Sequence, residues 1–123
     1  MEVLKISSEN IKKAAKILKK GGVIVYPTDT AYGLGGIFSS KKVIEKILKI
    51  KGRKDDKFTI VASSLYQVQK FFKLNSFEKK LAKKFWPGPL SIVVSSKCAV
   101  RVPKNKTAQK LCQLAGRPLI ATS

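Results

Sequence analysis

The sequence predicts an α/β domain in which a mixed sheet, with parallel and antiparallel pairs, is covered by helices. Apolar residues at helical spacing alternate along most of the chain with short β-branched runs. Glycines, prolines and serines mark most of the boundaries between the two kinds of segment. The length of 123 residues suits a single domain with one modest core, so we expect one domain over residues 1–123.

Helices are expected wherever apolar residues recur every three or four positions after a capping residue. The first pattern is closed by Gly21 and the second by Gly52, which are typical helix stops. In chain order, the expected starts are Ser8, Ser39 or Ser40, Ser63 or Ser64, Ser76 and Thr107. The fourth of these helices carries three large apolar side chains, Phe77, Leu81 and Phe85.

Strands are expected at the short β-branched runs, which are too short and too closely flanked by Gly or Pro to be helices. The runs cover residues 22–26, 59–62, 90–94, 99–102 and 119–122. The third and fourth runs are close enough in sequence to pair in antiparallel fashion. Residues 26–36, between the first strand and the second helix, are interpreted as a loop.

Composition narrows the class of protein. The chain is 44% hydrophobic, which excludes a disordered tail, and its apolar runs are far shorter than a membrane span. The N-terminus lacks the features of a secretory signal, so we expect a cytoplasmic protein with no membrane association. Cys98 and Cys112 are isolated and the chain has no histidine, which favours reduced core thiols over a disulfide or a zinc site.

The net charge of +19 has two interpretations of similar weight. Such self-repulsion favours a polyanionic partner, with nucleic acid as the natural candidate. Alternatively, lysine is simply abundant, and lysines along helices are usually solvated. The arginines are more selective, because only Arg53, Arg101 and Arg117 occur among 26 basic residues. A guanidinium recognises phosphate or carboxylate in a bidentate way that an ammonium cannot reproduce.

Two segments carry side chains suited to chemistry. Residues 26–36 follow a strand and are rich in hydroxyls, aromatic rings and glycines, which suits a ligand crevice, although spacing alone favours a tight turn. They match neither a P-loop nor a dinucleotide fingerprint.

Residues 51–57 hold four cations just after a helix end, where Lys51 alone would be explained by the helix dipole. The whole cluster could instead bind a polyphosphate. Asp55 and Asp56 would neutralise part of it, cap a turn or lie near Mg²⁺.

Three further segments are less specific. The aromatic pair and turn at residues 85–91 suggest an architectural anchor. Arg101 lies in an apolar strand and either points outward or fixes an anion, with equal weight. Residues 119–123 place two hydroxyls at the end of a strand.

Taken in this order, these segments resemble the YrdC-like family of threonylcarbamoyl-AMP synthases. The motifs are Pro-Thr-Asp-Thr-x-Tyr-Gly-Leu at 27–34, Lys-x-Arg at 51–53, Trp-Pro-Gly-Pro-Leu at 86–90, Arg-Val-Pro at 101–103 and the closing Thr-Ser. The resemblance covers residues 22–123. It implies a twisted mixed sheet with packed helices and one open concave face. It also implies that the chain lacks the C-terminal part usual in the family, including the Asn of a Ser-x-Asn motif that begins at Ser123.

The resemblance implies an enzyme that joins L-threonine, bicarbonate and ATP into threonylcarbamoyl-AMP for tRNA modification, with Mg²⁺ accompanying the triphosphate. The residues implied to bind threonine are Thr30, Arg101 and Ala121. Those implied to contact ATP are Lys51, Arg53, Lys57 and Ser123, and Lys51 with Arg53 would be catalytic. Expected partners are tRNA or double-stranded RNA and proteins of tRNA modification.

Two other functions are considered. The first is a noncatalytic module that binds double-stranded RNA through the phosphate backbone, which the net charge would suit. The second is the YrdC-like domain of a hydrogenase-maturation carbamoyltransferase. This second function is remote, because the chain has no zinc-finger cysteines and no attached domains.

Overall fold

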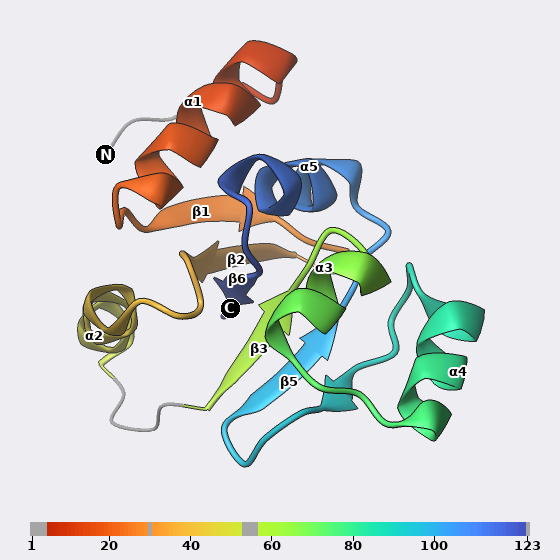
Figure 1. The fold of residues 1–123 in the computed structure, drawn as a ribbon. Coiled ribbons are helices and arrows are strands. Elements are labelled where there is room, and N and C mark those ends of the chain that lie inside the picture. Colours follow the sequence, from red (N-terminus) through yellow and green to blue (C-terminus); the bar gives the residue numbers. More distant parts are fainter. Residues whose placement is uncertain (1–4, 30, 53–56, 123) are drawn as a thin grey trace.

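The computed structural model describes residues 5–29, 31–52 and 57–122, and Figure 1 shows their arrangement. In chain order, the elements are α1 (Ser8–Lys19), β1 (Ile24–Pro27), β2 (Tyr32–Gly35), α2 (Lys41–Lys51), β3 (Phe58–Val61), α3 (Leu65–Phe71), α4 (Ser76–Phe85), β4 (Ile92–Val93), β5 (Cys98–Arg101), α5 (Lys106–Ala115) and β6 (Leu119–Ala121). The α/β class and the mixed sheet are confirmed. None of the helices in the described ranges is long and apolar enough to cross a membrane.

The helix boundaries follow the capping chemistry of the sequence. Ser7, Ser40, Ser64 and Asn75 each cap a helix by accepting a hydrogen bond from a backbone N–H in its first turn. Gly52 ends α2 with φ of 65°, a left-handed conformation that glycine adopts without steric cost. The helix starts expected from the sequence are therefore correct to within about two residues.

The strands form a four-stranded sheet in the order β4-β5-β3-β6 and a separate hairpin of β1 and β2. In the sheet, β3 runs parallel to β5 and antiparallel to β6, and β4 and β5 pair in antiparallel fashion as expected. The hairpin is a correction, because residues 26–36 are not simply a loop: residues 32–35 form β2. Two glycines and the exposed Tyr32 leave this strand without an apolar alternation, although its backbone pairs with β1.

The final strand, β6, joins the hairpin to the sheet. On one side it pairs with β3, and on the other its end bridges to β2 through Leu34 and Thr122, whose backbone groups exchange hydrogen bonds of 2.7 and 3.0 Å. Tyr26 adds a buried contact from β1, because its hydroxyl donates to the Ile120 carbonyl at 2.7 Å. Figure 1 shows β6 between the hairpin and β3.

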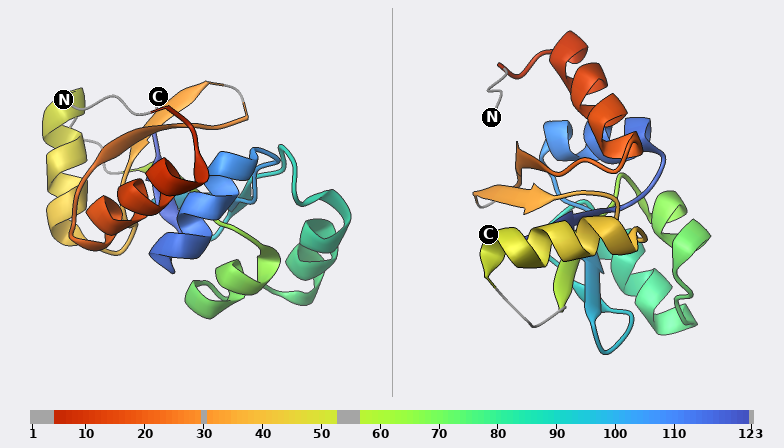
Figure 2. Two further views of the ribbon diagram at one scale, coloured as in Figure 1. Left: turned by 90° about the horizontal axis from the view of Figure 1, so that it is seen from above. Right: turned by 90° about the vertical axis from the view of Figure 1, so that its left-hand side faces the viewer.

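The sheet separates the apolar core into parts that lie on its two faces. On one face Val61 and Leu119 pack with α1, α5 and Tyr26, and Figure 2 shows α1 beside α5 over the hairpin. On the other, Ile60 and Val100 pack with side chains from α3 and α4. Neighbouring residues along β3 thus point to opposite faces, as the two-residue period of a strand requires.

Helix α4 begins at Ser76 as expected, but its aromatic side chains are exposed. Phe77 and Phe85 are 69% and 46% exposed, whereas Ala82 is the buried residue of this helix. The apolar spacing along this helix therefore does not mark a core-facing stripe, because the helix lies at the edge of the fold and contributes Ala82 to the core. The turn after it is the expected anchor, because the Trp86 ring Nε1 donates to the Leu90 carbonyl at 2.7 Å.

Candidate functional site

A small pocket, here called the hairpin pocket, lies between the β1–β2 turn and one end of the sheet. Its lining residues are Thr28, Ala31, Tyr32, Gly33, Thr59, Arg101, Ala121 and Thr122. Its volume of about 170 Å³ is close to that of a cavity that holds benzene, ~150 Å³, and below the ~300–1,000 Å³ of drug-sized ligand sites. The pocket therefore suits a molecule the size of an amino acid, not a whole nucleotide.

Strand register brings the sheet residues of the pocket onto one face. Thr59 of β3 pairs with Ala121 of β6, while Arg101 of β5 pairs with Val61, two residues beyond Thr59. Paired residues in neighbouring strands share a face, and so do residues two apart along a strand. Arg101, Thr59 and Ala121 consequently point to the same side, although they come from three strands.

Arg101 supplies a charged donor that no described residue satisfies. Its side chain is half-buried, and its Nε is the one buried side-chain nitrogen or oxygen in residues 5–29, 31–52 and 57–122 that has no hydrogen-bond partner. Leaving a buried donor unpaired costs about 1–3 kcal/mol, and more for a charged group. Such a group at a pocket wall is suited to an anionic ligand that completes its hydrogen bonds.

The glycine in β2 keeps the pocket open. A Cβ placed on Gly33 would lie 3.3 Å from Thr28 Cγ2 and 3.5 Å from Ala121 Cβ. Any larger side chain would therefore fill space between the turn and the sheet. Of the two interpretations of this segment, a ligand crevice and a tight turn, the pocket fits the first.

Two buried titratable groups, Tyr26 and Cys112, lie on the same side of the sheet as the pocket. Burial raises the pKa of the Tyr26 phenol well above its usual value; Cys112 adds to this rise and Arg101 opposes it. Burial likewise raises the pKa of the Cys112 thiol to about 12. Both groups are therefore protonated at neutral pH, and neither is available as a base.

The Cys112 shift predicts a loss of stability in alkali. Folding raises the pKa of the thiol from its ordinary value of 9.0 to about 12, so the stability it contributes is complete below about pH 9 and is lost as the pH rises from there to about 12. At pH 10.5, between the two pKa values, the expected loss is about 2 kcal/mol. In urea unfolding, the free energy of unfolding should decrease less between pH 8 and pH 10.5 for Cys112→Ala than for the wild type. Cys98→Ala, which removes a half-buried thiol, is the control and should behave as the wild type does. Equal decreases in the wild type and in Cys112→Ala would show that the Cys112 thiol is not the cause of the pH dependence.

The cationic segment, residues 51–57, directly precedes β3 in the chain, and β3 carries Thr59 of the pocket wall. Lys51 ends α2, and Lys57 immediately precedes Phe58, whose N–H donates to the Lys97 carbonyl at 2.8 Å. Lys57 is thus two residues from Thr59 of the pocket wall, although neither Lys51 nor Lys57 lines the pocket. Arg53, Asp55 and Asp56 lie outside the described residues, as do Thr30 and Ser123.

Of the expected site residues, the structure brings together Arg101 and Ala121. Thr59, Tyr32 and Gly33 also line the pocket but were not singled out from the sequence. The signal available for Thr59 was a hydroxyl within an otherwise apolar run, but only the sheet register places it beside Ala121. For Thr122 the sequence indicates only a hydroxyl at a strand end.

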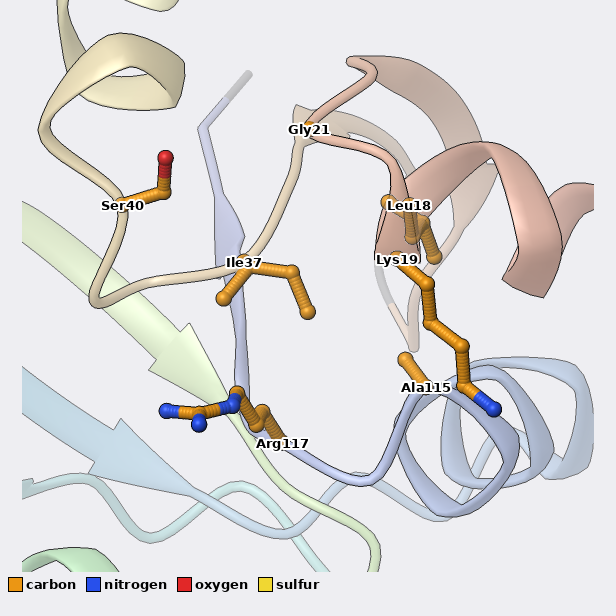
Figure 3. A pocket seen from close by; sticks show the side chains of 7 residues that line it. All are labelled: Leu18, Lys19, Gly21, Ile37, Ser40, Ala115 and Arg117. Atoms are coloured by element: carbon orange, nitrogen blue, oxygen red, sulfur yellow. The ribbon is translucent and has the colours of Figure 1, made fainter.

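A second cavity of about 180 Å³ lies between the ends of α1 and α5 and the start of α2 (Figure 3). Arg117 and Lys19 border it, but Figure 3 shows their charged ends pointing in different directions. The Arg117 guanidinium is already engaged, because Nη1 donates to Ser39 Oγ at 3.2 Å and the group lies over the Phe71 ring. This cavity therefore lacks the unpaired donor that distinguishes the hairpin pocket.

Comparison with known proteins links the whole arrangement to one family. The Sua5/YciO/YrdC family model, described as telomere recombination, matches residues 16–123. A threonylcarbamoyl-AMP synthase from Neisseria gonorrhoeae is 31% identical over 134 residues, which cover 96% of this chain and 71% of the relative.

Solved structures agree with this match. Sua5 from P. abyssi complexed with L-threonine superposes with a TM-score of 0.85 at 32% identity, covering 98% of this chain and 40% of that one. YciO from E. coli superposes with a TM-score of 0.80 at 29% identity, covering 97% of this chain and 65% of that one. The chain thus spans about seven tenths of the N. gonorrhoeae relative but less than half of P. abyssi Sua5.

Proposed function

Because this chain belongs to the Sua5/YciO/YrdC family, we propose that it is an L-threonylcarbamoyladenylate synthase that uses L-threonine, bicarbonate and ATP. The observation that carries the proposal is the unpaired Arg101 Nε at the wall of a pocket of amino-acid size. A carboxylate bound there would accept from the guanidinium in charge-assisted hydrogen bonds. Ala121 and Gly33 would leave room for the rest of the amino acid, and Thr30 would contribute to the same pocket.

The reaction needs positioning more than acid or base catalysis. The threonine amine forms a bond to the carbon of bicarbonate and water leaves, giving a carbamate. A carbamate oxygen then attacks the α-phosphorus of ATP, the bond to the bridging oxygen breaks, and pyrophosphate departs. Holding two anions in line and neutralising the leaving group supply most of the rate enhancement in such a transfer.

Charge neutralisation is assigned to the segment that precedes β3. Lys51 and Arg53 would contact the triphosphate as the catalytic cations, with Lys57 and Ser123 as further contacts to the nucleotide. This role for the cations is supported by their place in the chain, because the segment is followed directly by β3, whose Thr59 lines the pocket. The triphosphate would lie outside the hairpin pocket, which is too small for it.

Mg²⁺ would reach the site bound to the triphosphate, where it would neutralise phosphate charge. The carboxylate of Asp29, beside the pocket, accepts hydrogen bonds from two backbone amides, so its oxygens are already engaged. The residues in hand therefore fit a metal carried by substrate phosphates.

A role in tRNA modification would place the chain in the cytoplasm, with tRNA or double-stranded RNA and tRNA-modification proteins as partners. The net charge of +19 suits binding to the RNA.

The proposal is tested by pyrophosphate release from ATP and bicarbonate, with and without L-threonine. We expect release that depends on threonine, and Lys51→Ala should lower turnover at least about thirtyfold, because a removed charge contact to a transferring phosphate costs about 2 kcal/mol or more. Lys49→Ala, on an exposed position of the same helix, is the matched control and should retain activity. Wild-type release from Lys51→Ala would refute the assigned role. RNA binding with steep salt dependence but no pyrophosphate release would favour the noncatalytic module.

A further inference from the structure

We propose that Asp29 is a positioning residue that fixes the β1–β2 turn across the mouth of the hairpin pocket, and so sets the distance between the turn and Arg101. The inference rests on the proposed function, because its effect is expressed as binding of threonine. It concerns a carboxylate that is not part of the pocket lining and that accepts hydrogen bonds from two backbone amides.

The carboxylate of Asp29 forms two hydrogen bonds with the backbone that leads into α5. Asp29 Oδ2 accepts from the Lys104 N–H at 2.8 Å, and Oδ1 accepts from the Asn105 N–H at 2.6 Å. Asn105 is the N-cap of α5, so the carboxylate also lies at the positive end of that helix. Hydrogen bonds from amides to an ionised carboxylate are roughly twice as strong as neutral ones.

These bonds connect the two walls of the pocket. Thr28 and Ala31, on either side of Asp29 in sequence, line the pocket from the turn, and Thr28 N–H and Oγ1 both donate to the Ala31 carbonyl at 2.7 Å. The amides of Lys104 and Asn105 follow Arg101 by three and four residues, through the buried segment 102–103. The Asp29 carboxylate therefore ties the turn to the strand that carries the arginine.

A core role for Asp29 is excluded by its exposure. Its side chain is solvent-exposed and belongs to none of the apolar clusters, so truncating it leaves no cavity. Its loss should act mainly on the placement of the turn. Displacement of a binding group by about 1 Å is enough to lower the rate of an aligned reaction by about a hundredfold, so a loosened turn has a measurable effect.

The test uses Asp29→Asn and Asp29→Ala in the full chain, with Lys104→Ala as the matched control. Asparagine keeps one acceptor oxygen but turns an NH₂ group toward the second amide, whereas Lys104→Ala keeps the backbone N–H and removes only a side chain. By titration calorimetry, we expect the Kd for L-threonine to rise at least tenfold in both Asp29 variants, and the Kd for ATP to stay within about twofold. Lys104→Ala should match the wild type in both.

A readout without ligand separates this inference from the proposed function. Amide hydrogen exchange at Lys104 and Asn105 should accelerate in Asp29→Asn, while the exchange of β3 amides stays unchanged. If the wild type binds no threonine but these two amides are released in the variant, the proposed function fails and the positioning role stands. Unchanged exchange at both amides overturns the inference, as does an equal loss of threonine and ATP affinity, or wild-type threonine affinity in a folded Asp29→Ala variant.

Discussion

Arg101→Lys is expected to weaken L-threonine binding about a hundredfold and to lower threonine-dependent pyrophosphate release to a similar extent. Lysine keeps the charge but loses the planar, forked donor set, including the buried Nε that has no partner among the residues the structure describes. Truncating one partner of a buried, hydrogen-bonded charge pair costs about 2–5 kcal/mol, which spans this factor. Calorimetry with L-threonine and the pyrophosphate assay measure the two effects.

Arg117→Lys is the matched control, because Arg117 borders the second cavity and already donates to Ser39. It should leave both threonine binding and pyrophosphate release within about twofold of the wild type, a change of about 0.4 kcal/mol. The Arg101 assignment would have to be withdrawn if Arg101→Lys bound threonine as tightly as the wild type while remaining folded.

Gly35→Ala is expected to lower the free energy of unfolding by about 3 kcal/mol. A Cβ at this position would lie 1.6 Å from the Ile120 carbonyl oxygen and 3.1 Å from Tyr26 Cε1. The obstacle is backbone of β6, so the strand itself must move, and overpacking of this kind usually costs about 1–3 kcal/mol or more. The substitution therefore pushes the hairpin away from the strand that joins it to the sheet. Urea denaturation gives the change directly.

Gly21→Ala separates this clash from an effect of backbone conformation. Gly21 has φ of 86° but no atom within 4 Å of its missing Cβ, whereas Gly35 has an ordinary φ and no space. We expect about 1–2 kcal/mol of destabilisation for Gly21→Ala, from left-handed strain alone. A smaller effect for Gly35→Ala than for Gly21→Ala would contradict the close approach of β2 and β6.

The two substitutions also indicate how the fold supports the pocket. Gly35 allows β2 to approach β6, while Gly33 in the same strand leaves the pocket open above Ala121. Both depend on a hairpin that the sequence did not reveal, because β2 contains two glycines and the expected alternation of apolar side chains is absent. Residues 32–35 form a strand because their backbone pairs with β1. Backbone hydrogen bonds do not depend on side chains, so a hydrophobic pattern cannot predict them.

Features that depend on residues close in sequence, by contrast, are predicted correctly. Gly52 and one of the two expected caps, Ser40, bound α2, because capping involves a side chain and a backbone only a few residues away. The antiparallel pairing of the strands near residues 92 and 99 followed from their short separation. Helical spacing also located Phe77 and Phe85 on α4, but it did not indicate that they are exposed, since such spacing shows that an apolar side exists and not whether the fold covers it.

The sequence by itself determined the α/β class, the helix ends and, through motifs in family order, the membership of this chain in the Sua5/YciO/YrdC family. It also singled out Arg101 and Ala121, but not that they share a pocket with Thr59 and Gly33. Only the tertiary structure decided that, because register between strands far apart in the chain sets which side chains meet. The same long-range contacts brought Asp29 to the amides of residues 104 and 105, a pairing over more than seventy residues that no local pattern encodes.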